Sequence, residues 1–425
     1  MKDNEKLLDN IHEFTLESGI RVAVVEDSSI NKVRLSAIVN VGLIEPGFLE
    51  IGGAKVDGLV ALVMSKAFNY TQGGKISDIL IREGVYFDTS VTDTKTIFTI
   101  TTKDNVYEYI ARLMSYFSTF HIEKNSLELA KKEAILDIED RLKDQEFIQD
   151  LQVSSLVFDR DNKVEILKSY RKRIESINAT ILRKFFARFY VGNAMKFFIM
   201  GPINRDVVKQ TLESNPLKKS DLNLIQMKEE NWKKDEGTPK SFYQKDTKKT
   251  YSKVALAIKF PTRKDLYNKF GDDIFSLFSF IPNALFSETS PLICKAIKKG
   301  LITVVAEDKL IESKENILLL ASFVTFCPDE LFSYLNSNAK NVIKCPSRIR
   351  FAKVKQELVE EIQENEHNYN FLLNLFIKAN SNNVSIENFV TRIQNLSYKK
   401  MEEFVIGMKK AKLITYVERG KNVRS

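Results

Sequence analysis

The same order of strands and helices occurs twice along this chain of 425 residues. Each half begins with segments rich in β-branched residues and continues with segments whose apolar residues recur every three or four positions. The first half closes with the strand MKFFIMG at 195–201 and a last helix, and the second half closes with AKLITYVE at 411–418. This repetition predicts a duplication and an α+β fold, with an antiparallel-rich sheet packed against several helices in each half.

The length also favours two domains. A chain of 425 residues exceeds one ordinary core and suits two domains of about 200 residues each. A highly charged stretch without apolar periodicity separates the two halves. We therefore predict an N-terminal domain at 1–218, an exposed linker at 219–248 and a C-terminal domain at 249–425.

The composition is that of an ordinary soluble globular protein, with 44% hydrophobic and 28% charged residues. The net charge is +8, but the lysines are interleaved with acids, so nucleic-acid binding is not expected. A basic surface that faces an acidic partner and a merely solvated face both remain open. No segment reaches the roughly 18 uninterrupted apolar residues of a membrane span.

The start of the chain, MKDNEKLLDNIHEFTLESG, lacks the apolar run of a secretory signal. We expect a cytoplasmic location, unless a leader was removed. The three cysteines, Cys294, Cys327 and Cys345, are odd in number and have no paired spacing. This argues against a disulfide framework and against a structural zinc site. The chain also lacks a G-x-S-x-G motif and a phosphate loop.

Several short motifs resemble those of one enzyme family. FTLESGIRVAVVED at 14–27 is similar to F-x-L-x-N-G-L-x-V, and VNVGLIEPG at 39–47 resembles a strand that ends in a G-S-x-x-E turn. GLVALVMSKAFNYT at 58–71 lines up without a gap with G-L-A-H-L-L-E-H-M-L-F-K-G-T. GVYFDTSVTDTKTIF at 84–98 resembles G-x-x-x-N-A-x-T-x-x-D-x-T, and SPLICKAIKKGLITV at 290–304 resembles S-x-L-x-x-x-x-R-x-x-x-G-L-x-Y.

In this order, these motifs resemble the insulinase/pitrilysin-type zinc metallopeptidases, which include the mitochondrial processing peptidases. The resemblance implies a two-domain unit that forms half of a peptidase clamshell. In catalytic members, H-x-x-E-H places two histidines on one helix face toward Zn²⁺, and the glutamate serves as general base. A carboxylate from a later helix completes the ligand set.

The resemblance implies that this chain has lost the zinc site, so we expect no cofactor. Ala61 and Ser65 stand where the histidines would be, and Met64 stands where the glutamate would be. None of these side chains replaces its counterpart chemically. The third-ligand region is Ile138, Glu139 and Asp140, where the best local match gives isoleucine and where the carboxylates are also explained as surface charges that pair with nearby bases.

The histidines do not rescue the site, because His12, His121 and His367 include no pair one turn apart. The resemblance also implies an arginine and a tyrosine that position substrate around the G-L dipeptide of the second domain. Ala296 and Thr303 stand at those two positions. The lack of both side chains argues further against catalysis.

The resemblance implies one more site, at which an extended peptide pairs with an edge strand. Asp88, Thr89, Ser90 and Thr92 are its candidate residues, with Asp88 and Thr89 where the family usually has asparagine and alanine.

Two functions remain open for the chain. The first is a non-catalytic subunit that pairs with an active H-x-x-E-H peptidase, or with itself, and helps to enclose extended peptides. The alternative is a structural or interaction protein that kept the fold and lost peptide handling. An active peptidase with an unusual site would need ligands that the sequence does not provide.

Overall fold

The computed structural model divides the chain into two units. Unit 1 comprises Met1–Leu151, Asp161–Trp232 and His367–Phe376, and unit 2 comprises Gln152–Arg160, Lys233–Glu366 and Ile377–Ser425. The structure describes residues 10–43, 49–51, 54–56, 58–70, 74–92, 94–144, 147–148, 167, 169–219, 241–245, 250–260, 263–312, 317–338, 345–380, 384–408 and 412–420.

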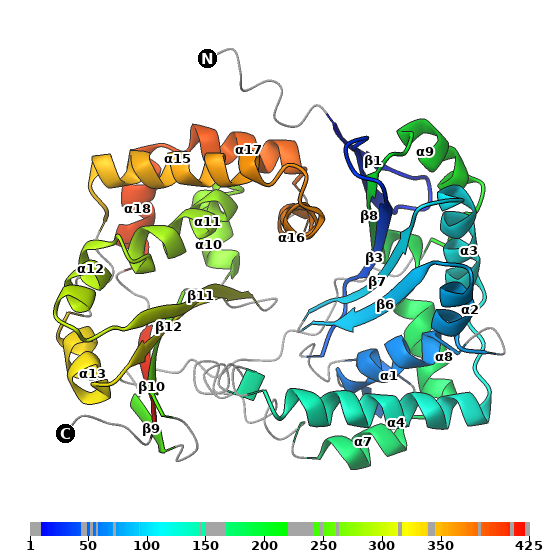
Figure 1. The fold of residues 1–425 in the computed structure, drawn as a ribbon, viewed down its shortest axis with the longest axis horizontal. Helices are drawn as coiled ribbons and strands as arrows, with labels where there is room; N and C mark the ends of the chain where they lie inside the picture. The colour runs from blue at the N-terminus through cyan, green and yellow to red at the C-terminus, as the bar shows by residue number, and fades with distance from the viewer. Residues whose placement is uncertain are drawn as a thin grey trace. The chain divides into compact units, whose positions relative to one another are not determined.

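A six-stranded sheet forms the centre of unit 1 (Figure 1). Its strands in spatial order are β1 (Ile11–Thr15), β2 (Arg21–Glu26), β8 (Met195–Gly201), β3 (Val33–Val39), β7 (Thr96–Thr102) and β6 (Tyr86–Val91). Neighbouring strands are antiparallel except β2 and β8, which are parallel. The strands are rich in Val, Ile, Phe and Thr, which pack well on a pleated surface. A short hairpin of β4 (Leu49–Ile51) and β5 (Ala54–Val56) lies outside this sheet.

Helices cover one face of the unit 1 sheet (Figure 1). They are α1 (Leu59–Phe68), α2 (Ile76–Arg82), α3 (Val106–Ser118), α4 (Lys124–Arg141), α7 (Tyr170–Ser176), α8 (Ala179–Phe189) and α9 (Arg205–Glu213), with a 3₁₀ turn at η2 (Gly192–Ala194). The side chains of Asn178 and Asn204 accept hydrogen bonds from backbone N–H groups in the first turns of α8 and α9, respectively. These caps satisfy donors that have no partner inside a helix, and so they fix where the two helices begin.

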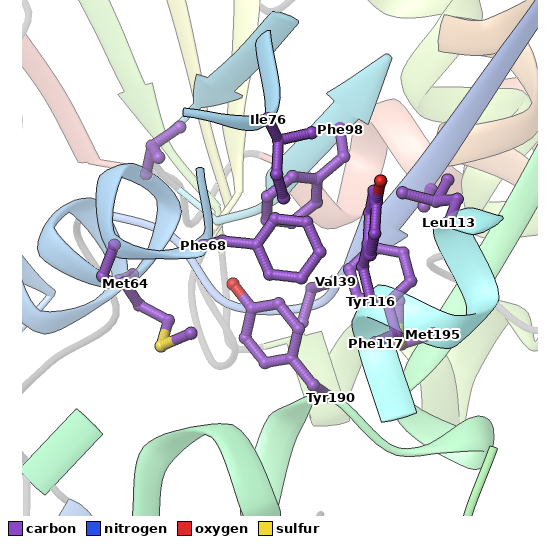
Figure 2. Close-up of a cluster of buried hydrophobic side chains, with 14 of the residues drawn as sticks. Val39, Met64, Phe68, Ile76, Phe98, Leu113, Tyr116, Phe117, Tyr190 and Met195 are labelled. Atoms are coloured by element: carbon purple, nitrogen blue, oxygen red, sulfur yellow. The ribbon is translucent and has the colours of Figure 1, made fainter. Parts of the chain in front are cut away.

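An aromatic cluster fills the core between these helices and the sheet (Figure 2). The ring centroid of Phe68, at the end of α1, lies 4.6 Å from that of Phe98 and 4.8 Å from that of Phe117. The ring of Tyr190 lies 6.0 Å from Phe117 and 4.8 Å from Phe186. Buried rings at these separations contribute both apolar area and favourable edge contacts.

The other face of the sheet carries a helix from much later in the chain. The first part of α16 (Tyr369–Asn380) belongs to unit 1. Tyr369 packs edge-to-face on Phe198 of β8, and its hydroxyl donates to Ser36 Oγ of β3 at 2.8 Å. Both sides of the sheet are thus buried at its centre, which explains why every residue of β8 is buried.

Unit 2 is built around a five-stranded sheet. Its strands in spatial order are β11 (Val304–Glu312), β12 (Ile317–Thr325), β10 (Ser252–Lys259), β13 (Lys412–Arg419) and β9 (Ser241–Lys245). Its helices are α10 (Arg263–Phe270), α11 (Asp273–Phe286), α12 (Pro291–Lys298), α13 (Pro328–Ser337), α15 (Arg348–Glu364), α17 (Ile386–Asn395) and α18 (Tyr398–Met408), together with the end of α16. Gly271, with φ +56°, separates α10 from α11.

The two sheets share one topology. The order β9-β13-β10-β12-β11 repeats β2-β8-β3-β7-β6, and in both sheets the first two strands of this series are parallel. In both series, helices lie along the chain between the third and fifth strands, and again between the fourth and second strands. The predicted α+β fold with two similar halves is confirmed.

The charged segment 219–248 is predicted to be an exposed linker, but part of it forms a strand. Ser241–Lys245 forms β9, which pairs in parallel with β13 and takes the place that β2 holds in unit 1. The prediction missed this strand because SFYQK is short and is followed by lysines, so it shows little alternation. Most other residues of the segment lie outside the described ranges.

Candidate functional site

Helix α1, which the motif resemblance aligns with the metal-binding helix of the peptidases, is buried on nearly all sides. Every residue except Lys66 is buried, and Ala61, Met64 and Ser65 are each 0% exposed. The hydroxyl of Ser65 donates to the Leu62 carbonyl oxygen at 2.8 Å. The helix starts against the backbone of Leu43, because a Cβ on Gly58 would lie 1.9 Å from the Leu43 oxygen. Glycine at this position therefore lets α1 dock.

Helix α4 packs against α1 and carries the three candidate third-ligand positions. Ile138 is 0% exposed and belongs to the same apolar core as Ala61 and Met64. Glu139 accepts hydrogen bonds from Tyr170 and Arg171, and Asp140 accepts one from Lys143 on the exposed side of α4.

The residues at these positions do not fit a zinc ion. Ala61 and Ile138 have no atom that can bind a metal, and the Ser65 hydroxyl already donates to the backbone. The Met64 thioether is a poor ligand for zinc. No group of three His, Cys, Asp or Glu side chains suited to a metal occurs within the described ranges.

The three histidines lie in separate parts of the fold. His12 on β1 contacts Arg205 through Nδ1 at 3.0 Å, and His121 lies in the exposed loop between α3 and α4. His367 precedes α16 and contacts the buried carboxylate of Asp27 at 2.8 Å. None of them lies on α1 or α4.

Charged side chains join α1 to α4 beside Ser65 and Ile138. Lys66 Nζ lies 2.7 Å from Asp137 Oδ2, and Arg141 Nε donates to Asp137 Oδ1 at 2.5 Å. Lys66 is next to Ser65 in sequence, and Asp137 is next to Ile138. Burial favours the neutral acid, but the hydrogen bonds and charges of the two cations outweigh it and lower the pKa of Asp137.

A second contact of the same kind lies one turn away along α4. Glu133 Oε1 accepts from the Tyr70 hydroxyl at 2.7 Å and from Lys75 Nζ at 2.9 Å. Burial and the bond to Glu133 raise the pKa of Tyr70. Ion pairs and apolar packing thus hold α1 and the segment after it against α4.

Strand β6, which holds Asp88, Thr89 and Ser90, lies at one edge of the unit 1 sheet (Figure 1). Thr92 follows the strand and donates its backbone N–H to the Lys95 carbonyl oxygen at 2.8 Å. Because alternate residues of a strand point their backbone groups to opposite sides, the N–H and C=O groups of Asp88 and Ser90 point toward β7.

The backbone groups of the intervening residues, Phe87, Thr89 and Val91, therefore point away from β7. At the start of the strand, the Val85 N–H also points away from β7 and donates to Leu80. Nothing within the described part of the chain pairs with the three outward residues. Among the described residues, they present a short row of donors and acceptors without partners.

Side chains of β6 alternate between the two faces of the sheet. Phe87 and Val91 are buried on the helix-covered face, while Tyr86, Asp88 and Ser90 are exposed on the other face. Tyr86 is 57% exposed. The edge thus combines open backbone groups with a polar surface that has one carboxylate at its centre.

The two positions around the G-L dipeptide differ in solvent exposure. Ala296 on α12 is buried, and Thr303 just before β11 is exposed. The Thr303 backbone N–H donates to Val324 of β12 at 2.9 Å. Neither side chain can hold a peptide carbonyl or an oxyanion as arginine and tyrosine would.

Comparisons with known proteins concern the family and the fold of the chain. Residues 176–309 match the sequence family described as the peptidase M16 inactive domain. The predicted resemblance to the M16 (insulinase/pitrilysin-type) peptidases is confirmed. No curated protein has a sequence that matches the chain.

Solved structures of M16 proteins share the fold over nearly the whole chain. An M16-like protein from Alicyclobacillus acidocaldarius is 12% identical with a TM-score of 0.78, and the match covers 96% of this chain and 98% of that one. A peptidase M16 inactive domain from Pseudomonas fluorescens is 15% identical with a TM-score of 0.66, covering 98% and 99%. Pitrilysin is 14% identical with a TM-score of 0.68, and the match covers 96% of this chain and 45% of pitrilysin.

Two features of this M16-like chain gave no signal in the sequence. The Lys66–Asp137 pair joins residues far apart in the chain, and single charges on helices are too common to indicate a pairing. Docking of Tyr369 on Phe198 likewise joins segments that no motif connects. Among the helices that the structure describes, none is long and apolar enough to cross a membrane.

Proposed function

We propose that this chain is a non-catalytic M16 homologue that serves as the partner subunit of an active H-x-x-E-H peptidase. The observation that carries the proposal is the complete burial of Ala61, Met64 and Ile138 in the apolar core, with Ser65 equally buried beside them. A helix pair with no suitable donors and no solvent access does not activate water. Residues 176–309, which lie outside this helix pair, also match a family described as an inactive domain.

The chain contributes peptide binding to such a complex through the edge of β6. An extended peptide added beside Phe87, Thr89 and Val91 satisfies their free N–H and C=O groups. Each such hydrogen bond is worth about 0.5–1.5 kcal/mol net. The side chains of Asp88, Ser90 and Thr92 then face the peptide or flank it.

The second candidate is a structural or interaction protein that no longer handles peptide. Loss of both the metal ligands and the arginine/tyrosine pair, now Ala296 and Thr303, favours this alternative. In either case, we propose a cytoplasmic location and pairing with a second subunit, an active relative or another copy of this chain.

The test begins with purification of the tagged chain from its native cells. Recovery of an H-x-x-E-H relative, with peptide cleavage that a chelator abolishes and that the isolated chain lacks, is the expected result. Recovery of the chain alone, or of partners that cleave no peptide, contradicts the partner-subunit function and favours the structural alternative.

A proline variant separates peptide binding from pairing. In Thr89→Pro the lost N–H points outward, so the β6–β7 pairing remains while strand addition is blocked. The complex should still form, but its cleavage should fall. Lys124→Pro is the matched control, because proline is favoured at the first position of a helix, here α4, and the site is exposed and away from β6.

A further inference from the structure

The unit 1 sheet carries rows of side chains that run across its strands, and one of these rows ends in a charge. On the face opposite α1, the row runs from β1 through β2, β8, β3 and β7 to β6 and consists of Glu13, Ala23, Phe198, Ser36, Thr99 and Asp88. The two hydroxyl groups in the middle of the row bond to each other, with Ser36 Oγ 2.9 Å from Thr99 Oγ1. The row ends at the open edge with the Asp88 carboxylate.

The sheet surrounds Asp88 with neutral side chains. Its neighbour across β7 is Thr99, its diagonal neighbours are Ile97 and Thr101, and its neighbours along β6 on the same face are Tyr86 and Ser90. No ion pair reaches Asp88 from the residues that the structure describes. No described strand continues this row beyond Asp88, so its next member would come from a strand added at the edge.

Strand geometry places that next residue close to Asp88. The outward backbone groups belong to Phe87, Thr89 and Val91, so Asp88 would form a non-hydrogen-bonded pair with an added antiparallel strand. Side chains in such pairs approach more closely than in hydrogen-bonded pairs. A carboxylate there favours a cation opposite and disfavours an anion.

We infer that the peptide bound at β6 carries a lysine or arginine opposite Asp88, flanked by a β-branched or aromatic residue opposite Tyr86. The inference rests on the proposed peptide-binding function and names the class of peptide. It comes from the place of Asp88 on the edge strand, where its neighbours across β7 and along β6 are neutral. The exposed Tyr86 ring adds the second preference, because aromatic and β-branched residues pair well across strands.

The test uses the purified full chain and fluorescein-labelled peptides Thr-Val-Thr-Xaa-Thr-Val-Thr, in which Xaa is Lys, Gln or Glu. Dissociation constants come from fluorescence anisotropy. The Lys peptide should bind about two- to tenfold more tightly than the Glu peptide, with Gln between them, given the strength of an exposed cross-strand charge pair. Higher salt should reduce this ratio.

Variants assign the preference to one side chain. Asp88→Asn should bring the Lys-to-Glu ratio close to one, and Asp88→Lys should reverse it. Asp104→Asn is the matched control, because Asp104 is exposed beyond the end of β7 and away from the edge. Its ratio should equal that of the unmodified chain.

Two other outcomes overturn the inference in distinguishable ways. If all three peptides bind the unmodified chain equally and Thr89→Pro abolishes binding, the edge is a peptide site but Asp88 does not select a cation. If no peptide binds, peptide binding at β6 fails and the inference fails with it.

Discussion

Removal of the Tyr190 hydroxyl should make the protein more stable. The side chain is 3% exposed, and its hydroxyl has no hydrogen-bond partner among the described residues. Burial also raises the pKa of this phenol, so it stays neutral at any ordinary pH. A buried hydroxyl without a partner costs about 1–3 kcal/mol relative to its hydrated state in the unfolded chain.

Phenylalanine keeps the ring contacts of Tyr190 and removes this cost. The ring still packs against Phe186 at 4.8 Å and Phe98 at 5.9 Å. The lost oxygen leaves a void of about 10 Å³, which costs only about 0.2–0.3 kcal/mol. The free energy of unfolding of Tyr190→Phe should therefore rise by about 1–2.5 kcal/mol.

Scanning calorimetry measures this change on the full chain. For a unit of about 200 residues, each kcal/mol shifts Tm by about 2–4 °C, so the transition that contains unit 1 should move up by about 2–10 °C. Chains with two units need not unfold in one step, so each transition is fitted separately.

Tyr369→Phe is the matched control for this measurement. Tyr369 is also buried, but its hydroxyl donates to Ser36 Oγ at 2.8 Å. Its loss should lower stability by about 0.5–1.5 kcal/mol, the opposite sign. A drop in Tm for Tyr190→Phe, or equal shifts for the two variants, would refute the claim that hydrogen-bond satisfaction decides the sign.

Two further predictions concern the α1–α4 contact. Asp137→Asn should lower the free energy of unfolding by about 1–3 kcal/mol at pH 7, because Lys66 and Arg141 lose a charged acceptor. The folded-state pKa of Asp137 lies below its ordinary 3.8, so this contribution is present above 3.8 and is lost as pH falls through the lower value. Urea unfolding of both proteins between pH 2 and pH 7 should show the difference shrink at the acid end, and a constant difference would contradict it. Ala61→His should lower the free energy of unfolding by about 1–3 kcal/mol without creating a zinc site, because position 61 is 0% exposed. An unchanged Tm in calorimetry, or zinc that stays bound after dialysis, would show that the helix has room for a ligand.

Much of the fold could be predicted from local patterns. Alternation of Phe87 and Val91 with Asp88 and Ser90 predicts a half-buried strand, and the repeated order of elements predicts two similar sheets. β9 was missed because its five residues lie in a charged stretch, where neighbouring lysines mask the pattern. Only its parallel pairing with β13 makes this segment a strand.

The candidate site was predictable to a different extent. The positions Ala61, Met64 and Ser65 followed from a motif alignment, but their complete burial depends on packing that no local pattern encodes. The free backbone groups of Phe87, Thr89 and Val91 follow from the strand order and from the turn at Thr92, which are properties of the folded sheet.

The open edge of β6 also has a consequence for how the isolated protein behaves. Free, regularly spaced backbone groups beside an exposed Tyr86 form a template for any β-strand, including one from another copy. β11, the corresponding edge of unit 2, is interrupted by a register shift between Val305 and Glu307, a common device against such pairing. Of these two edges, the β11 edge is therefore protected and the β6 edge is not. In concentrated solution without peptide or partner, self-association should begin at β6.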